Sequence, residues 1–310
     1  MGPLEELAAV KVARDTALTI GVFDGVHVGH RYLLDNVRTA AAERGLASAV
    51  VTFRNHPVTV LRPHVQVTYL CAVDQRMELL RQSGIEHVAP LTFTRELSRL
   101  TAREFVAALV ERLRMRWLLV GPDFALGRGR EGTFPVLTKL GKELGFEVAR
   151  AAPFTEAGRV VSSTAIRRAL AQGDVEQAAK FLGRAYSLTG PVVLGDRRGQ
   201  TLGFPTANLQ IAADISLPAD GVYCTVTWVD QQPHDAVTNI GVRPTFGELK
   251  RTVEAHLLEF EGDLYDKTLT IELIERIRPE QRFSGVDELV AQLNRDVATA
   301  KGVLAARVSS

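Results

Sequence analysis

Two histidines, His27 and His30, enclose a valine and a glycine where an apolar run gives way to a helical pattern. Residues 18–23 have the composition of a buried strand. From Gly29 the apolar residues recur with the period of a helix that Gly45 would end. The histidines are therefore expected at a strand-to-helix turn, where free N–H groups of the helix N-terminus can bind an anion. Two imidazole donors at such a turn can stabilise the charge that develops on a phosphate under attack.

The rest of this turn fits a triphosphate, because glycines let the backbone approach phosphate groups without a Cβ in the way. A lone histidine is most often a surface or core residue without a chemical role, but a glycine-flanked pair at a strand end favours a functional site. His56, which follows a strand-like segment at 46–53, is a further candidate for the same cleft. The turn residues expected to bind ATP are Gly21, Phe23, Asp24 and Gly29.

A second segment, residues 159–168, has the composition of another anion-binding turn. Ser163 is placed to cap a helix that Thr164 opens, so that hydroxyls and backbone N–H groups converge on one point. Arg167 follows one turn later and can grip a phosphate with two parallel donors. Taken alone, this is a capped helix with a solvated arginine. Together with the histidine turn, this segment, including Ser162, is expected to form the second half of one ATP site.

Thr206 and Asn208 stand out in the C-terminal half. They are two residues apart, so on an extended backbone both side chains point to the same side. A hydroxyl and an amide carbonyl are hard oxygen ligands suited to Mg²⁺ that bridges the phosphates of ATP. A local turn after Pro205 is the alternative. Gly195 and Gly203 are expected to shape a loop over the phosphates.

The length of 310 residues suggests two domains, expected at 1–183 and 184–310. In the first, strand-like and helix-like segments alternate, which predicts an α/β fold with a doubly wound parallel sheet and ligands at the carboxyl ends of its strands. Both anion-binding turns belong at that edge, so one shared cleft is expected. The expected strands are 18–23, 46–53, 87–93, 117–120, 147–152 and 159–161, and the expected helices are 29–44, 74–82, 101–114 and 134–144.

Helices expected at 164–171 and 174–182 connect the halves, with Gly173 as the stop of the first and Asp174 as the N-cap of the second. After Gly183 the pattern changes to short alternating strands. This predicts an antiparallel β-barrel closed by a C-terminal helix over 285–303. The expected barrel strands are 186–193, 222–229, 236–241, 252–260 and 268–277.

Charge is nearly balanced, with 37 basic and 36 acidic residues, so a broad surface for nucleic acid is not expected. No apolar run reaches the length that crosses a membrane, and the first residues lack the pattern of a signal peptide. Cys71 and Cys224 stand in different expected domains and suit a reducing cytoplasm. The expected partners are therefore small molecules, and weak self-association is left open.

The motifs resemble one known family. The pattern HxGH followed by SSTxIR is similar to the nucleotidylyltransferase superfamily, and the fuller segments at 21–30, 50–53 and 120–127 resemble its bifunctional bacterial riboflavin kinase/FMN adenylyltransferase branch, the FAD synthetases. The segments at 199–208, 217–223, 239–246 and 252–258 resemble that family's kinase module. The resemblance runs from about residue 19 to about residue 301. It implies phosphorylation of riboflavin to FMN and adenylylation of FMN to FAD, with ATP as co-substrate and Mg²⁺.

The kinase reaction requires a base, because the terminal hydroxyl of riboflavin is a very weak acid. Glu254 matches the family motif and lies in an alternating segment, on the strand face opposite Val253 and Ala255. A solvated strand carboxylate is the alternative. The resemblance also implies that Thr206 and Asn208 serve the metal and the nucleotide.

Adenylylation needs no such base, because the FMN phosphate has a second pKa of about 6 and is mostly dianionic at neutral pH. Positioning and charge stabilisation suffice, with His27 and His30 as the catalytic residues and no covalent intermediate. The segment 120–127 is expected along the nucleotide or flavin cleft, although its aspartate equally fits a turn. The flavin-binding residues that the resemblance implies are Asp123, Phe124 and Arg243.

The chain departs from the family pattern at several positions. Gln200 replaces an arginine near the phosphate loop, and Leu126 replaces an aromatic residue that would pack on the flavin. Arg31 stands for a glutamine and Asn55 for a proline. These changes bear on rate and flavin packing rather than on the residues proposed for catalysis.

Three other functions fit the sequence less well. A single-activity adenylyltransferase, acting on pantetheine phosphate or a nicotinamide nucleotide, is disfavoured by Asn208 and Glu254 in the second half. A tRNA synthetase-like function is disfavoured by the balanced charge and by the lack of a KMSKS-like loop and an anticodon-binding domain. A regulator that binds flavin or nucleotide without turnover is disfavoured by the intact histidine pair, but the sequence does not exclude it.

Overall fold

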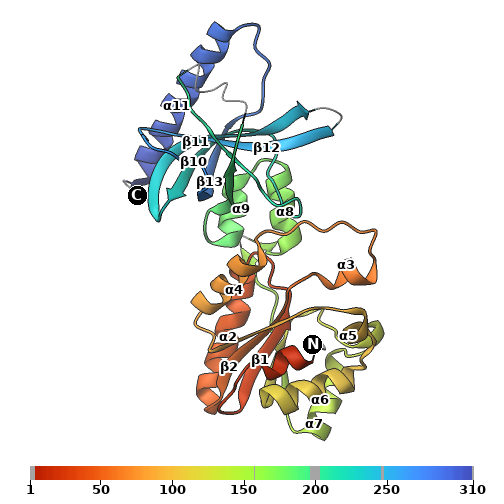
Figure 1. The fold of residues 1–310 in the computed structure, drawn as a ribbon. Helices are drawn as coiled ribbons and strands as arrows, with labels where there is room; N and C mark the ends of the chain where they lie inside the picture. The colour runs from red at the N-terminus through yellow and green to blue at the C-terminus, as the bar shows by residue number, and fades with distance from the viewer. Residues whose placement is uncertain (1–3, 157, 196–202, 246–247, 309–310) are drawn as a thin grey trace. The chain divides into compact units, whose positions relative to one another are not determined.

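The structure is a computed structural model that describes residues 4–156, 158–195, 203–245 and 248–308, and the chain divides into two compact units, Met1–Ser163 and Thr164–Ser310 (Figure 1). Helices α8 (Ser163–Ala171) and α9 (Val175–Leu182) connect the sheet to the barrel strands. They fall almost wholly in the second unit, because α9 packs against barrel strands β8 (Tyr186–Val193) and β13 (Thr268–Arg278). The domain boundary expected after residue 183 remains a prediction.

Five parallel strands form the sheet of the first unit, in the order β3-β2-β1-β4-β5. From β1 the chain moves outward in one direction through β2 and β3, and in the other through β4 and β5. This leaves a switch point at the carboxyl ends of β1 and β4, where doubly wound sheets bind their ligands. The predicted α/β fold is therefore confirmed. The strands are β1 Thr16–Gly21, β2 Ala47–Phe53, β3 His87–Leu91, β4 Met115–Val120 and β5 Glu147–Arg150.

Helices cover both faces of this sheet, because successive strand residues point to opposite sides and each side is apolar. One core contains Ala17 with side chains of α2 (Val28–Arg44) and α4 (Val73–Gln82). The other contains Leu18 with side chains of α1, α6 and α7. The remaining helices of the first unit are α1 Glu5–Ala8, α3 Pro57–Leu61, α5 Arg95–Arg99, α6 Ala102–Leu113, the 3₁₀ turn η1 Arg128–Arg130 and α7 Phe134–Leu144.

The strand expected at 159–161 does not join the parallel sheet. It is β7 (Arg159–Val160), which pairs antiparallel with β6 (Thr155–Glu156) in a separate two-stranded ribbon. Arg159 and Val160 are both exposed, Val160 by 60%, so this two-residue strand adds nothing to the core of the parallel sheet. The segment contains a strand, as expected, but the strand pairs with β6 and not with the parallel sheet, so the expected partner was wrong.

The second unit is a closed barrel in the order β10-β11-β12-β9-β8-β13, in which neighbouring strands of the described residues pair antiparallel, as the sequence predicted. The new strands are β9 Ala207–Leu209, β10 Gly221–Val229, β11 Gln232–Thr245 and β12 Glu248–Leu257. Helix α11 (Val286–Val308) packs against β10, β11 and β13. Asp174 caps α9 by accepting from the N–H of Gln177 at 2.9 Å, which confirms its expected role.

Strand β11 begins four residues before its predicted start at 236. It follows β10 through a two-residue turn in which Asp230 and Gln231 have φ angles of 48° and 68°. Such a turn normally contains glycine or asparagine, and neither is present here. The missing turn signal explains why the hairpin extends further than the sequence suggested.

We expect Arg278→Met to destabilise the barrel by about 3–5 kcal/mol, because it removes the partner of a buried charge. The guanidinium of Arg278 donates to both carboxylate oxygens of Asp296, whose side chain is 1% exposed on α11. Denaturant unfolding of the intact protein measures this loss. The matched control is Lys301→Met, which breaks an exposed pair with Glu259 and should leave unfolding unchanged. Equal effects of the two substitutions would contradict the prediction.

Candidate functional site

The turn after β1 has an unusual backbone. Phe23 and Val26 have φ angles of 53° and 39°, and Gly25 between them has 78°. The left-handed region is costly for non-glycine residues, above all for a β-branched valine, and such strain is maintained only where surrounding contacts require it. Thr52 contributes one of these contacts, donating its hydroxyl to the Val22 carbonyl at 3.1 Å. The strained turn leads directly into α2.

The predicted histidine pair meets at the start of α2. His27 is the N-cap, and its Nδ1 accepts from the backbone N–H of His30 at 3.2 Å, which leaves the ring proton on Nε2. The two rings stack with centroids 3.6 Å apart, and the Phe23 ring lies edge-on to His30 at 5.0 Å. A Cβ on Gly29 would lie 3.3 Å from the His27 ring, so the glycine makes room for the imidazole. The sequence spacing thus produces a fixed pair of imidazoles.

His30 is held as a neutral imidazole. Desolvation by burial lowers its pKa well below the ordinary value, and the nearby His27 and Arg76 lower that pKa further. Its ring is nevertheless not wholly covered, since the residue is only half-buried. A neutral imidazole donates one hydrogen bond and accepts another, so His30 can offer an N–H to an anionic group without carrying a charge of its own.

Asp24 and Ser163 join this turn. The buried Asp24 carboxylate accepts from the N–H of Leu70 at 2.9 Å, and its carbonyl accepts from the Ser163 hydroxyl at 3.0 Å. Ser163 is the first residue of α8, one position later than the cap expected for it. The structure thus brings Ser163 to the histidine turn. The nucleotide-binding roles of Ser162, Thr164 and Arg167 remain predictions, and the last two belong to the second compact unit.

An apolar cavity lies in the same unit, and Phe124 of the segment after β4 lines it. Phe53 and Phe93 line it from the ends of β2 and β3, with their rings edge-to-face at 5.6 Å. Leu126, the departure from the family pattern, is also part of its wall. The sequence identified Phe124 but missed the other aromatic residues, because they are far apart in the chain and only the sheet brings them together.

Two residues of this region have local structural roles. Asp123 is exposed and lies in a turn, and its carbonyl accepts from Arg130 at 2.9 Å, while it does not line the cavity. His56 caps α3, its Nδ1 accepting from the N–H of Val58 at 3.1 Å. The turn alternative for Asp123 therefore agrees with the backbone. Its flavin-binding role remains a prediction.

In the barrel, Glu254 lies at the centre of a cross-strand row. It is directly opposite Asn208 on β9 and directly opposite Asn239 on β11. Side chains of directly opposite residues share one face of a sheet, about 4.5–5.5 Å apart at Cβ. Thr252 donates its hydroxyl to the Glu254 carboxylate at 3.1 Å. Asn239 was missed as a site residue, because nothing local reveals the register that places it there.

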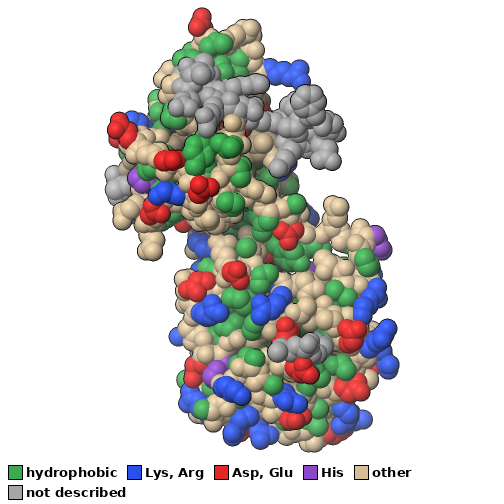
Figure 2. All heavy atoms as spheres, viewed as in Figure 1, with side chains coloured by type: hydrophobic (Ala, Val, Ile, Leu, Met, Phe, Trp, Pro, Cys, Tyr) green, Lys and Arg blue, Asp and Glu red, His purple; other side chains and the backbone are tan. Residues whose placement is uncertain are grey.

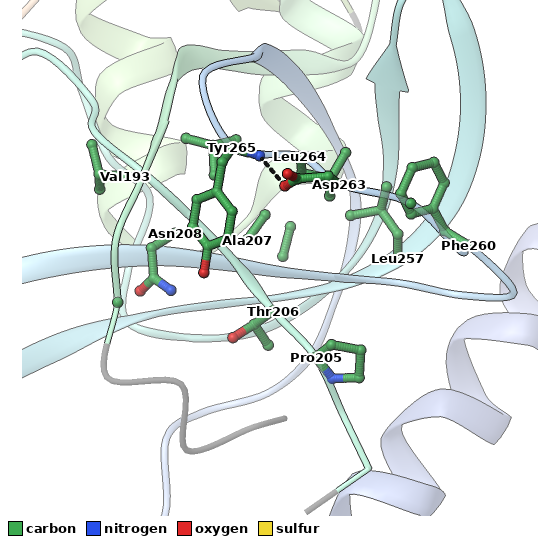
Figure 3. Close-up of a pocket in the computed structure, with 14 residues that line it drawn as sticks. Val193, Pro205, Thr206, Ala207, Asn208, Leu257, Phe260, Asp263, Leu264 and Tyr265 are labelled. Carbon is green, nitrogen blue, oxygen red and sulfur yellow. Dashed lines mark hydrogen bonds between the residues drawn. The ribbon is translucent and has the colours of Figure 1, made fainter. Parts of the chain in front are cut away.

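A second cavity opens beside this row (Figure 3). Thr206 and Asn208, which are two residues apart, both line it. Tyr265 and Asp263 line it from the loop after β12. A Cβ on Gly195 would come within 2.2 Å of the Asn208 amide nitrogen, so this close approach requires glycine. Glu254 is not among the lining residues, so the carboxylate lies next to the cavity rather than in its wall.

The oxygen donors of this cavity fit a magnesium ion. Within the described ranges there is no group of three or more His, Cys, Asp and Glu side chains that could hold a metal. Mg²⁺ in phosphoryl-transfer sites needs no such cage, since one or two protein oxygens and the substrate phosphates suffice. The Thr206 hydroxyl and the Asn208 amide oxygen meet that need. Gly203 has a φ of 84°, the conformation a tight loop requires, whereas Gln200 and the side chain of Arg243 lie outside the described part of the chain.

Acidic and basic side chains are interspersed over the face shown in Figure 2, in line with the balanced charge. Among the described residues, no helix combines the length and the hydrophobicity needed to cross a membrane.

We expect the stability of the first unit to fall as pH decreases through about 6.5, because of His30. Its pKa is lowered in the folded state, so below the ordinary pKa the unfolded chain takes up a proton that the folded chain does not. The His30→Gln variant should lose less stability than the wild type between pH 7.5 and 5.5 in denaturant unfolding. His64→Gln, at an exposed position, is the control and should behave as the wild type. Identical pH dependence of all three proteins would refute the assignment.

The chain matches two family models, one in each half. The FAD synthetase model matches residues 9–165, and the riboflavin kinase model matches residues 182–304. A solved structure titled as a macrolide-efflux protein from Streptococcus pneumoniae has a TM-score of 0.88 at 30% identity, covering 95% of this chain and 96% of its own.

Named relatives agree with the family models over nearly the full length. The bifunctional riboflavin kinase/FMN adenylyltransferase of Escherichia coli K12 is 40% identical, over 92% of this chain and 91% of its own. The enzyme of that name from Bacillus subtilis is 33% identical, over 91% of this chain and 90% of its own. With matches of this extent in both halves, the chain belongs to the bifunctional riboflavin kinase/FMN adenylyltransferase family.

Proposed function

We propose that this protein phosphorylates riboflavin to FMN in its barrel and adenylylates FMN to FAD at its histidine turn, using ATP in both reactions. The observation that carries the proposal is that each family match coincides with a site of the appropriate chemistry. The barrel has a carboxylate opposite an amide beside a cavity, and the parallel sheet has a fixed imidazole pair at its switch point. Cys71 and Cys224 are both buried and are not joined in a disulfide, which suits action in the cytoplasm.

In the kinase reaction, Glu254 takes the proton of the terminal riboflavin hydroxyl as that oxygen bonds to the γ-phosphorus of ATP, and ADP leaves. The hydrogen bond from Thr252 orients the carboxylate. Asn208 and Thr206 would hold Mg²⁺, which when bound neutralises charge on the ATP phosphates. Tyr265 offers an aromatic ring in the same cavity, suited to packing on a planar base.

In adenylyl transfer, an oxygen of the FMN phosphate attacks the α-phosphorus of ATP, and the bond to pyrophosphate breaks. The attacking group is already ionised, so the protein supplies donors and position rather than a base. His27 and His30 are fixed at a helix N-terminus, where N–H groups and imidazoles can stabilise the charge on the transferring phosphate. Ser163 adds a hydroxyl to this turn.

The apolar cavity after β4 is suited to the isoalloxazine ring of FMN. Its wall contains several aromatic side chains, which favour a flat conjugated ligand. Leu126 replaces one aromatic surface there, which predicts weaker flavin packing than in relatives with the aromatic residue.

A time course with riboflavin, ATP and Mg²⁺, resolved by chromatography, tests the proposal directly. FMN should appear first and FAD after it. Tight flavin binding without any product would favour the regulator and overturn the proposal.

We expect Glu254→Gln to lower FMN formation by about 10²–10⁴-fold, because the amide cannot accept the proton. FAD formation from supplied FMN should stay at the wild-type rate. Glu259→Gln, an exposed carboxylate nearby on the same segment of chain, is the matched control and should retain both activities. Full kinase activity in Glu254→Gln would remove Glu254 from the mechanism.

His30→Ala should show the reverse pattern. Losing one donor to the transferring phosphate is expected to lower FAD formation by about 10²–10³-fold while FMN formation continues. His64→Ala serves as the control, since that histidine is exposed and outside both sites. Loss of both activities in a folded His30→Ala protein would show that the two reactions do not occupy separate sites.

A further inference from the structure

Arg76 is the largest side chain that the first unit buries completely. It lies on α4 and is 0% exposed. Arginine is almost never fully buried without a partner, because removing its charge from water is expensive. A buried guanidinium in this position therefore calls for a functional explanation.

The guanidinium joins the ends of two strands. Its Nη1 donates to the Val22 carbonyl at 3.0 Å, just after β1, and to the Phe53 carbonyl at 2.6 Å, the last residue of β2. Val22 opens the strained turn that leads to the histidine pair. Arg76 thus helps to fix that turn through the Val22 carbonyl. The Tyr69 ring lies 5.6 Å from the Cζ of Arg76.

The remaining donors of Arg76 are unpaired. In the described part of the chain, its Nε and Nη2 are buried without a hydrogen-bond partner, and no carboxylate forms an ion pair with it. The Nδ1 of His30 is buried and unpaired as well. Arg76 donates to the Val22 carbonyl, and the ring of the next residue, Phe23, lies 5.0 Å from the His30 ring, so these orphaned atoms belong to one neighbourhood.

Guanidinium N–H groups can only donate, whereas one nitrogen of a neutral imidazole can accept. A water that accepts from Arg76 has its own protons left to donate, and buried waters typically satisfy such groups. Donation to Nδ1 of His30 would place the imidazole proton on Nε2, the nitrogen then available to a substrate phosphate. Nε and Nη2 of Arg76 and Nδ1 of His30 are the atoms that such a water-mediated connection requires.

We propose that Arg76 is a positioning residue of the adenylyl-transfer site, which fixes the histidine turn through the Val22 and Phe53 carbonyls and holds His30 with its proton on Nε2. The role rests on the function proposed above for that turn. The proposal goes beyond that function by adding Arg76, a buried residue on another helix that touches no substrate.

The test compares Arg76→Met and Arg76→Lys with Arg81→Met in the full chain. Arg81 lies on the same helix, exposed and paired only with Glu78, so its substitution should change nothing. Arg76→Met should lower kcat for FAD formation by about 10²-fold, the cost of misplacing a catalytic group by about 1 Å, with a much smaller change in KM for ATP. Lysine retains the charge and can reach one carbonyl, so Arg76→Lys should recover part of the loss. FMN formation by the barrel should be unchanged in all three variants.

The imidazole ¹⁵N spectrum supplies a readout that is independent of activity. The His30 signals, assigned with His30→Gln, should report the Nε2–H tautomer in the wild type and in Arg81→Met, and a mixture in Arg76→Met. An unchanged tautomer, or FAD formation within twofold of the wild type in a folded Arg76→Met protein, would overturn the proposal. If the wild type makes no FAD, the proposed function fails, while the spectra still decide whether Arg76 orients His30.

Discussion

The histidine turn depends on a backbone that must leave a parallel strand and enter a helix within a few residues. Left-handed φ values at three of its residues, Phe23, Gly25 and Val26, make this connection possible. Such a conformation is unfavourable by itself and persists because its surroundings hold it. Thr52 and Arg76 both donate to the Val22 carbonyl, and Ser163 donates to the Asp24 carbonyl. The active geometry of the imidazoles is thus a property of the whole sheet edge rather than of the turn alone.

The two sites solve related problems of phosphate chemistry with different scaffolds. The parallel sheet places the N-terminus of α2 and the imidazole pair together, which suits a reaction whose nucleophile is already ionised. The barrel aligns a carboxylate and amides across neighbouring strands, which suits a reaction that must remove a proton. Asn239 and Asn208 lie directly opposite Glu254 on the two neighbouring strands. Each scaffold thus positions the protein groups that its proposed reaction requires.

Much of this arrangement could be predicted from local sequence. The periodicity change at Gly29 located α2, and the short spacing of His27 and His30 placed both rings at one helix N-terminus. The alternation around Glu254 identified its strand face, since that face follows from the twofold period alone. Errors arose where partners decided the outcome, as for β7, which pairs with β6 instead of joining the sheet. The hairpin at Asp230 was predicted too short, because its turn lacks the usual residues.

By itself the sequence determined the two fold classes, the family, and which short segments carry the reactive side chains, because these depend on residue type and on spacing along the chain. Only the tertiary structure decided which distant residues meet. The register of β9, β11 and β12 sets Asn208 and Asn239 beside Glu254, and the strand order gathers Phe53, Phe93 and Phe124 around one cavity. Burial of Arg76 against the ends of β1 and β2 follows from how α4 packs on the sheet. Such contacts arise from packing between elements that are far apart in sequence, and no local pattern encodes them.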